Sequence, residues 1–313
     1  MERKLYLELC QRQAMKGGVL VEYDGVAYQP YAYELKFQQD GKIKHTAILK
    51  FMRNKGGKCR MKVLSLFDGI SCGMVALERA GIPVERYVAY EIEPNAIKIS
   101  QKNYPQIEHC GDVTTADFTQ YKGFDLVIAG SPCQGFSIAG GKLNFEDPRS
   151  KLYFEFERAL REVKPKYFLL ENVKMKYEWS RTITERLGVQ GITINSKLVS
   201  AQSRNRTYWT NIDFETVIPD RGITLQSILE FGETKCKKSK TVRVGGSGSG
   251  WGNKHEWDMP NESRVYTTVE LERLQTLPDN YTIGVSEAKR RQCIGNGWTV
   301  DVIAHIFKGL KEA

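Results

Sequence analysis

The sequence contains no long apolar run. No stretch approaches the roughly 18 apolar residues that a membrane-spanning helix needs. The first residues, Met1–Leu5, do not lead into the apolar core of a signal peptide. The sequence therefore predicts neither a membrane protein nor a secreted one. We expect a cytoplasmic protein, in a reducing compartment.

Cysteine is scarce and scattered, with seven residues in 313. No C-x-x-C pair and no Cys/His cluster at metal-ligand spacing occurs, so we expect neither a disulfide scaffold, nor a zinc finger, nor any other metal site. Hydrophobic residues make up 41% and charged residues 27%, which excludes the disordered and fibrous classes. The net charge of +9 favours a nucleic-acid partner.

Residues 1–60 differ from the rest, because they hold 12 Lys/Arg against 6 Asp/Glu. Tyr31–Phe37 and Lys42–Leu49 alternate partly between apolar and polar residues around an Asp40-Gly41 turn, which predicts a β-hairpin. We therefore predict a small basic β appendage on a flexible tether. Its role stays open between a solvated accessory segment and a binding site for DNA or a partner.

From Met61 onward, short apolar runs alternate with helical patterns. The predicted strands are Val63–Phe67, Tyr87–Tyr90, Leu126–Ala129 and Tyr167–Leu170. The predicted helices are Met74–Ala80 before Gly81, a helix opened by Pro94, and Lys151–Val163. Almost wholly apolar strands that alternate with helices predict an α/β fold, with a parallel sheet covered on both faces.

Chemically active residues follow each predicted strand. They are Asp68-Gly69, Glu91, Gly130–Cys133 and Glu171-Asn172. Ligands of open α/β sheets bind outside the carboxyl ends of the strands, so these groups should share one site.

The types of these residues indicate the kind of site. A glycine turn followed 22 residues later by Glu91 suits a ribose-bearing adenosine ligand, although such glycines also occur as plain turns. Cys133 lies in a loop just past a buried strand, with Glu171 at the neighbouring strand end. This setting favours a nucleophilic thiolate over a structural cysteine.

Eight motifs, in order from about Lys62 to Phe307, resemble those of the cytosine carbon-5 DNA methyltransferases. They are Leu66–Gly73, Tyr90–Ile92, Gly111–Val113, Gly130–Gln134, Glu171–Val173, Gln202–Arg206, Arg264–Glu270 with Leu274-Gln275, and Gly295–Val300. The resemblance implies a Rossmann-like, S-adenosyl-methionine-dependent methyltransferase fold with a small target-recognition subdomain. It divides the chain into the appendage 1–60, a catalytic and cofactor-binding domain 61–211, a target-recognition segment 212–262 and a C-terminal return 263–313.

The reaction that the resemblance implies uses a covalent adduct. The Cys133 thiolate would add to carbon 6 of cytosine, and carbon 5 would then attack the methyl group of S-adenosyl-methionine. Glu171 would hold N3 and the exocyclic amine, and if it is protonated or shares a proton with N3 it would neutralise developing charge. Arg206 would bind O2 with Arg204 in support. The sequence does not identify the base that removes the carbon-5 proton.

The cofactor site implied by the resemblance draws on the same strand ends. Its predicted residues are Phe67, Asp68, Gly69, Gly73, Glu91, Ile92, Asp112, Val113, Pro132, Asn296 and Trp298. Glu91 would take the ribose hydroxyls and Asp112 the adenine amine. Gly297 stands where the family commonly has serine, so a hydroxyl is missing there.

Double-stranded DNA is the implied substrate, with the target cytosine flipped out of the stack. The loop Gln134–Pro148 would close over the base, and Gln134, Ser137, Ile138 and Ala139 would contact DNA. The segment 212–262 is short, which suggests a short recognition sequence. Within it Lys240 and Arg243 would contact DNA, although charge runs are often solvated faces.

Two alternatives stay open: a tRNA cytosine methyltransferase with the same catalytic set, and a non-catalytic homologue that regulates an active enzyme. The intact Pro132-Cys133-Gln134, Glu171 and Arg206 argue against the second. We expect a bacterial or phage source. The sequence leaves open both restriction protection, beside a companion endonuclease that forms no stable complex, and phage self-protection.

Overall fold

The structure is a computed structural model that describes residues 60–131, 152–242 and 265–312, together with the backbone of strands between residues 21 and 49. The chain divides into two compact units, Met1–Cys59 and Arg60–Ala313. In the first unit, two strand pairs are antiparallel: β1 (Val21–Tyr23) with β2 (Val26–Tyr28), and β3 (Pro30–Phe37) with β4 (Ile43–Leu49). The β3–β4 pair confirms the predicted hairpin.

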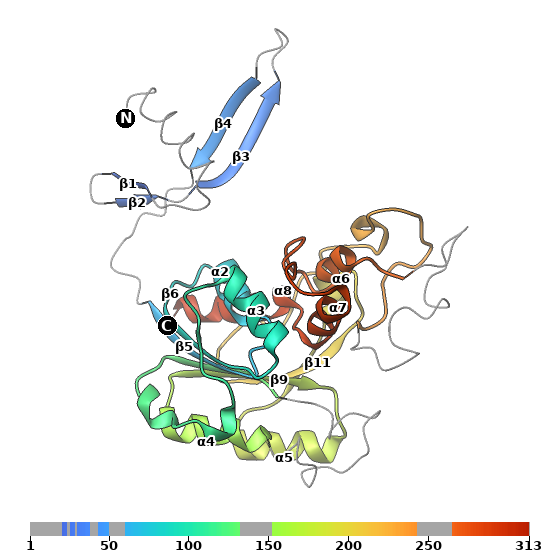
Figure 1. Ribbon diagram of the computed structural model, residues 1–313. Coiled ribbons are helices and arrows are strands. Elements are labelled where there is room, and N and C mark those ends of the chain that lie inside the picture. The colour runs from blue at the N-terminus through green and yellow to red at the C-terminus, as the bar shows by residue number, and fades with distance from the viewer. Residues whose placement is uncertain are drawn as a thin grey trace. The chain divides into compact units, whose positions relative to one another are not determined.

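A seven-stranded sheet forms the centre of the second unit (Figure 1). The strands are β5 Met61–Leu66, β6 Val84–Tyr90, β7 Glu108–His109, β8 Leu126–Gly130, β9 Tyr167–Val173, β10 Ile192–Asn195 and β11 Asn205–Thr210. Their order is β10-β11-β9-β8-β5-β6-β7. The five strands from β9 to β7 are parallel, whereas β11 and β10 are added antiparallel. The predicted Rossmann-like fold with a mostly parallel sheet is therefore confirmed.

The strand β9 is longer than predicted. The apolar run Tyr167–Leu170 predicts an end before Glu171, but β9 continues to Val173 because β11 pairs with its last residues. Glu171 lies opposite Gly130 of β8 on one side and Tyr208 of β11 on the other. The expectation that Glu171 follows the strand is thus wrong: it stands inside the sheet, on backbone that is hydrogen-bonded on both edges.

Helices cover both faces of the sheet. They are α2 Cys72–Ala80, α3 Pro94–Asn103, α4 Leu152–Val163, α5 Tyr177–Leu187, α6 Thr268–Leu274, α7 Glu287–Asn296 and α8 Val300–Phe307. In Figure 1, α2, α3 and α8 lie on one face, and α4 and α5 lie on the other. Gly81 ends α2 in the left-handed conformation, and Pro94 occupies the first turn of α3, both as predicted.

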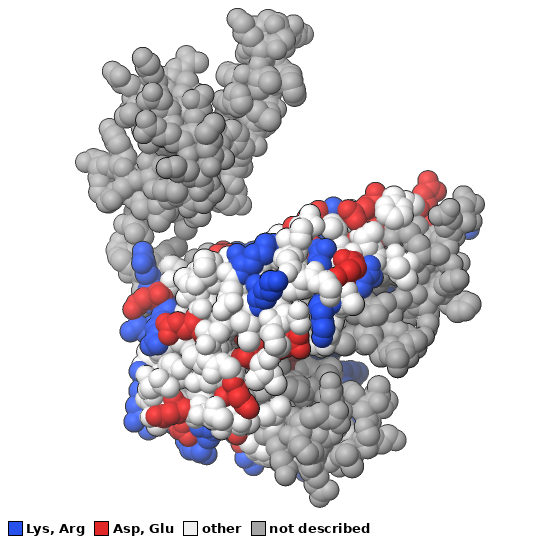
Figure 2. All heavy atoms as spheres, viewed as in Figure 1, with Lys and Arg blue, Asp and Glu red and all other residues white. Residues whose placement is uncertain are grey.

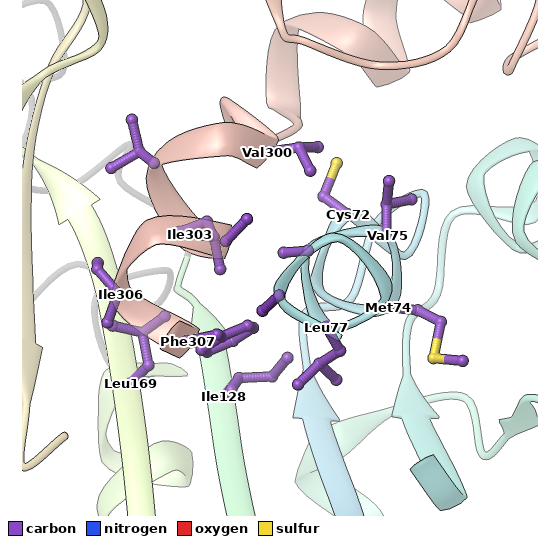
Figure 3. Close-up of a cluster of buried hydrophobic side chains, with 14 of the residues drawn as sticks. Cys72, Met74, Val75, Leu77, Ile128, Leu169, Val300, Ile303, Ile306 and Phe307 are labelled. Atoms are coloured by element: carbon purple, nitrogen blue, oxygen red, sulfur yellow. The ribbon is translucent and has the colours of Figure 1, made fainter. Parts of the chain in front are cut away.

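A hydrophobic cluster fills the space on each face of the sheet. Figure 3 shows part of the larger one, in which Val300, Ile303 and Phe307 of α8 lie beside α2, with Ile128 and Leu169 of the sheet. The second cluster packs Phe156 of α4 and Ile183 of α5 against the opposite face. A fully buried side chain of this kind contributes about 1.5–3 kcal/mol, so the two clusters stabilise the helices on both faces of the sheet.

A third, smaller cluster lies under the described part of the segment 212–262. Its buried residues are Ala201, Leu225, Ile228, Val242, Tyr266, Leu271, Leu274 and Ile294. They come from that segment, from α6 with the residues just before it, from α7 and from the loop before β11. The described part of the segment therefore packs on the C-terminal helices.

None of the helices that the structure describes is long and apolar enough to cross a membrane. No group of three or more His, Cys, Asp or Glu side chains among the described residues could hold a metal ion.

Candidate active site

The carboxyl ends of β5, β6, β8 and β9 place the predicted groups at one edge of the sheet. Neighbouring strands in this part run in the order β9-β8-β5-β6, so Glu171, Ser131, Asp68 and Glu91 follow one another along that edge. The convergence predicted from sequence therefore holds for the residues that the structure describes.

Glu171 is only 8% exposed, and each of its carboxylate oxygens has a donor. The guanidinium Nε of Arg206 lies 2.9 Å from Oε1. The indole Nε1 of Trp298 donates to Oε2 over 3.1 Å. Arg206 is brought there by the antiparallel pairing of β11 with β9, in which it lies opposite Val173, two residues past Glu171. Each oxygen keeps a second lone pair, so the carboxylate can still accept from a ligand.

Arg204 is 3% exposed and has a different environment from Arg206. Its guanidinium donates to the backbone carbonyls of Val242 at 2.8 Å, Gly297 at 3.1 Å and Gly295 at 3.4 Å. Arg204 thus joins the predicted target-recognition segment to the last motif. Arg204 therefore contributes to the site by fixing the backbone at these carbonyls.

The loop between β5 and α2 is tightly folded around Asp68. The carboxylate of Asp68 accepts from the hydroxyls of Ser65 at 2.6 Å, Tyr87 at 2.7 Å and Ser71 at 2.5 Å. Burial of the carboxylate raises its pKa to about 6, although the three hydroxyls oppose the shift. These contacts show that Asp68 fixes the conformation of the loop. Its predicted contribution to the cofactor site would therefore be indirect, through the shape of the loop.

Glu91 binds the same loop from the end of β6. One oxygen accepts from the backbone N–H of Gly69 at 2.7 Å, and the other accepts from Ile92 and Glu93 at 2.8 Å each. Gly69 has φ +60°, in the left-handed region that favours glycine. The glycine turn and the acid 22 residues later are therefore in direct contact, and the half-buried carboxylate stands at the edge of the sheet.

The remaining predicted cofactor residues that the structure describes lie around this edge. Ile92 is 70% exposed, which is unusual for isoleucine. Asp112 is exposed, and hydrogen bonds from the backbone and hydroxyl of Thr114 to one oxygen lower its pKa. Phe67 is half-buried, Gly73 and Val113 are buried, and Asn296 is exposed at the end of α7.

Gly73 is closely surrounded. A Cβ added there would come within 2.5 Å of Ile128 and 2.8 Å of the Tyr87 hydroxyl. The motif glycine at position 73 is therefore needed for the packing of α2 on the sheet, whatever else it does.

Several predicted residues lie outside the described residues. They are Pro132, Cys133, Gln134, Ser137, Ile138, Ala139 and Arg243. The structure does describe the anchor that precedes Cys133, because the Asn172 amide donates to the Ser131 hydroxyl at 2.9 Å. Both residues are buried. The chain therefore leaves the sheet toward Cys133 from a point fixed beside Glu171.

The basic run around Lys240 contains side chains of two kinds. Lys238 points inward, where its ammonium donates to the carbonyls of Lys197, Ser200 and Ile223 at 2.6–2.9 Å. Burial lowers the pKa of Lys238. Lys240 has an exposed side chain. The sequence alone does not show that Lys238 binds backbone carbonyls whereas Lys240 is exposed.

Four buried polar residues, which lie within the motifs but received no role of their own from the sequence, form hydrogen bonds beside Glu171 and the last motif. Gln275 donates to the carbonyls of Ile294 and Gly297, and accepts from Thr299 and Gln202. Asn172 is the fourth. Apolar residues flank the pairs Glu171-Asn172 and Gln275-Thr276 in the sequence, which is a signal of buried, hydrogen-bonded polar groups. Gln202, which lies among Ser and Arg residues, has no such signal.

The fold and these contacts define an α/β protein in which three hydrogen-bonded carboxylates, Asp68, Glu91 and Glu171, lie at the carboxyl ends of parallel strands, where proteins of this class bind their ligands. The model of the family C-5 cytosine-specific DNA methylase matches residues 61–187 and 176–312. The chain belongs to this family and is a DNA cytosine-5 methyltransferase. The resemblance stated from the eight motifs is thereby confirmed.

Known proteins resemble the chain in sequence and in fold. The Type II methyltransferase M.NlaX of Neisseria lactamica is 29% identical over 80% of this chain and 96% of its own length. The Type II methyltransferase M.NgoBV of Neisseria gonorrhoeae is 31% identical over 70% of this chain and 61% of its own length. The solved structure of the Entamoeba histolytica methyltransferase EhMeth has a TM-score of 0.68 at 18% identity, covering 81% of this chain and 98% of that one.

Proposed function

We propose that this enzyme methylates a cytosine flipped out of double-stranded DNA, that Cys133 forms the transient covalent bond, and that S-adenosyl-methionine is the methyl donor. The observation that carries the proposal is the Glu171 carboxylate, fixed by Arg206 and Trp298 beside the anchored end of β8. The family membership supports the reaction, and the geometry supports the roles of the residues.

The residues at the edge of the sheet suit S-adenosyl-methionine. The exposed apolar surface of Ile92 is of the kind that an adenine ring would cover, and the free oxygen of Asp112 suits the adenine amine. Glu91, at the end of β6, would take the ribose hydroxyls. When bound, this donor supplies an electrophilic methyl group.

The described residues of the base site have matching hydrogen-bonding capacity. Glu171 would accept a hydrogen bond from the exocyclic amine of cytosine on a lone pair that Arg206 and Trp298 leave free, and would hold N3 through a proton shared between the carboxylate and N3. Arg206 uses Nε for Glu171 and Nη1 for the carbonyl of Asn205, and its Nη2 has no partner among the described residues. That group is suited to the O2 oxygen. Charge that develops on the ring as the thiolate adds would then be stabilised on both sides.

The covalent step has a direct test. DNA that contains 5-fluorocytosine should trap the enzyme, because fluorine cannot leave as a proton does. We expect a stable adduct with the wild type and none with Cys133→Ser or Cys133→Ala, while Cys133→Ala still binds the cofactor. Turnover by Cys133→Ala would refute the mechanism, and a wild type without adduct would favour a non-catalytic homologue.

The nucleic acid is tested by methyl transfer from tritiated cofactor to duplex DNA and to tRNA in parallel. Labelled DNA is the expected result, and labelled RNA with unlabelled DNA would refute it. On the face seen in Figure 2, described Lys and Arg residues are interspersed with Asp and Glu. We therefore propose that the loop Gln134–Pro148 and the segment around Lys240 and Arg243 make the DNA contacts.

The biological role follows from the relatives. Because these include Type II methyltransferases of bacteria, we propose that the enzyme marks recognition sites in the cytoplasm of a bacterial or phage-infected cell. A companion endonuclease would act on unmarked DNA without forming a stable complex. Bisulfite sequencing of DNA from expressing cells should show one short methylated sequence, and methylation without sequence context would contradict the proposal.

A further inference from the structure

Trp298 links two parts of the site that lie on different strands. Its indole N–H donates to Oε2 of Glu171 at 3.1 Å, on the opposite side of the carboxylate from Arg206. An indole nitrogen is a donor only. The contact therefore has one possible direction and adds no charge beside Glu171.

The indole ring packs directly against two glycines, where a side chain would leave no room for it. A Cβ added at Gly130 would come within 2.7 Å of Nε1, and one added at Gly73 would lie 3.6 Å from Cζ3. The ring thus fills the space between the end of β8, the first turn of α2 and Glu171. Any larger residue at Gly130 would push the nitrogen away from the carboxylate.

The backbone on both sides of Trp298 is fixed as well. The carbonyl of Gly297 accepts from Arg204 at 3.1 Å and from Gln275 at 3.0 Å. The hydroxyl of Thr299 donates to Gln275 at 3.0 Å. The indole is consequently mounted on clamped backbone, in contrast to a surface tryptophan.

We propose that Trp298 is a positioning residue for Glu171: with Arg206 on one oxygen and Trp298 on the other, the carboxylate plane is fixed where the cytosine edge arrives. This inference rests on the proposed function and assigns to Trp298 a task distinct from the cofactor contact predicted for it. A single donor would leave the carboxylate free to rotate about its terminal bond, whereas two donors on opposite oxygens prevent that rotation.

The substitution Trp298→Phe keeps most of the ring and removes the N–H. We expect kcat to fall about 10- to 100-fold, the range that loss of a hydrogen bond to a charged group gives. The Kd for S-adenosyl-methionine, measured by calorimetry, should stay within about two-fold of the wild type, because a Phe ring still fills the space beside Gly73. A split between kcat and cofactor affinity is what a merely structural or cofactor-binding role would not produce.

Trp209→Phe is the matched control. Trp209 is fully buried on β11, and its N–H donates over 3.0 Å to the hydroxyl of Thr184, away from Glu171. Trp209→Phe removes the same indole N–H, from a hydrogen bond of similar length, 3.0 Å against 3.1 Å. We expect its folding stability to fall and its kcat to stay unchanged.

Gly130→Ala tests the inference without altering Trp298. Its new methyl group would displace the indole nitrogen from Glu171, and kcat should fall to about the level of Trp298→Phe. This variant decides the matter if Trp298→Phe does not fold, as judged by its thermal unfolding.

Three results would overturn the inference. The first is an unchanged kcat in Trp298→Phe, provided that this variant folds. If it does not fold, an unchanged kcat in Gly130→Ala has the same meaning. Another is a loss confined to cofactor affinity, which would make Trp298 a cofactor residue only. The third is a wild type that forms no adduct with 5-fluorocytosine DNA. That result fails the proposed function itself, whereas the first two leave it intact.

Discussion

The carboxyl group of Asp68 should make the stability of the catalytic unit fall as the pH rises. Burial raises its pKa from 3.8 to about 6 in the folded chain. The folded chain therefore binds this proton more tightly than the unfolded chain does. The resulting stabilisation is fully present below about pH 4 and is lost as the pH rises through about 6. At 1.36 kcal/mol per pKa unit, the whole change is about 3 kcal/mol.

Asp68→Asn removes the titration and keeps the shape of the side chain. The difference in unfolding free energy between variant and wild type should then change with pH by about 1.4 kcal/mol between pH 5 and pH 7.5, in favour of the variant at high pH. Urea unfolding at closely spaced pH values, followed by tryptophan fluorescence, measures it. The hydroxyls of Ser65, Ser71 and Tyr87 can rotate to bind an amide. Any free energy lost in this rearrangement is the same at every pH, so it changes the height of the difference curve but not its slope. A difference curve that is flat over this range would refute the assignment of the proton to Asp68.

Three further predictions follow from the contacts of the site. Glu91→Ala should weaken cofactor binding before it affects the base site, because it removes the acceptor of three backbone N–H groups at the glycine loop. Calorimetry with S-adenosyl-methionine checks this, and unchanged affinity would contradict it. Arg204→Met should lower the unfolding free energy by about 2–4 kcal/mol, since it leaves buried carbonyls without their charged donor. Arg206→Met leaves the buried Glu171 carboxylate without its ion-pair partner, so it should lower stability as well, but it should lower the kcat of the folded enzyme far more than Arg204→Met does. Equal losses of kcat in the two variants would show that the two arginines share one role. Lys238→Ala should lower thermal stability with an unchanged salt dependence of DNA binding, because its ammonium binds three backbone carbonyls. Lys240→Ala should reduce the slope of log K against log salt by about 1. A reduced slope in Lys238→Ala and an unchanged slope in Lys240→Ala would show that Lys238 faces the phosphates.

Four of the five parallel strands could be predicted because their signals are local, whereas the two-residue strand β7 has no apolar run and is not predicted. An apolar run of four or five residues bounded by glycine or an acid identifies β5, β6 and β8 with errors of a few residues. The strand β11 could not be predicted in this way. It consists of Asn205–Thr210, whose polar residues read as a motif, and it becomes a strand because β9 and β10 offer it edges on both sides. A pairing that joins segments more than 30 residues apart has no signature within either segment.

The same reason limits what the sequence says about the site. Motif order indicates which side chains belong together. In the structure Glu91 contacts the glycine loop and Arg206 contacts Glu171. Motif order does not show that Arg204 points at backbone carbonyls while Arg206, two residues later, points at a carboxylate. Side-chain partners in a sheet depend on the register of the neighbouring strand, and register is a property of two segments together.

The position of Glu171 inside the sheet bears on how the substrate must approach. A cytosine paired in a duplex already uses its N3 and exocyclic amine to bind guanine, and these are the groups that Glu171 would take. Glu171 cannot advance to meet the base, since its backbone is hydrogen-bonded on both edges and both carboxylate oxygens are held. The base therefore has to leave the stack and come to the carboxylate, at a cost of a few kcal/mol. A fixed Glu171 also helps to offset the free energy of flipping. A carboxylate on a mobile loop would meet the arriving base in many orientations, so its hydrogen bonds to the base would offset less of that free energy.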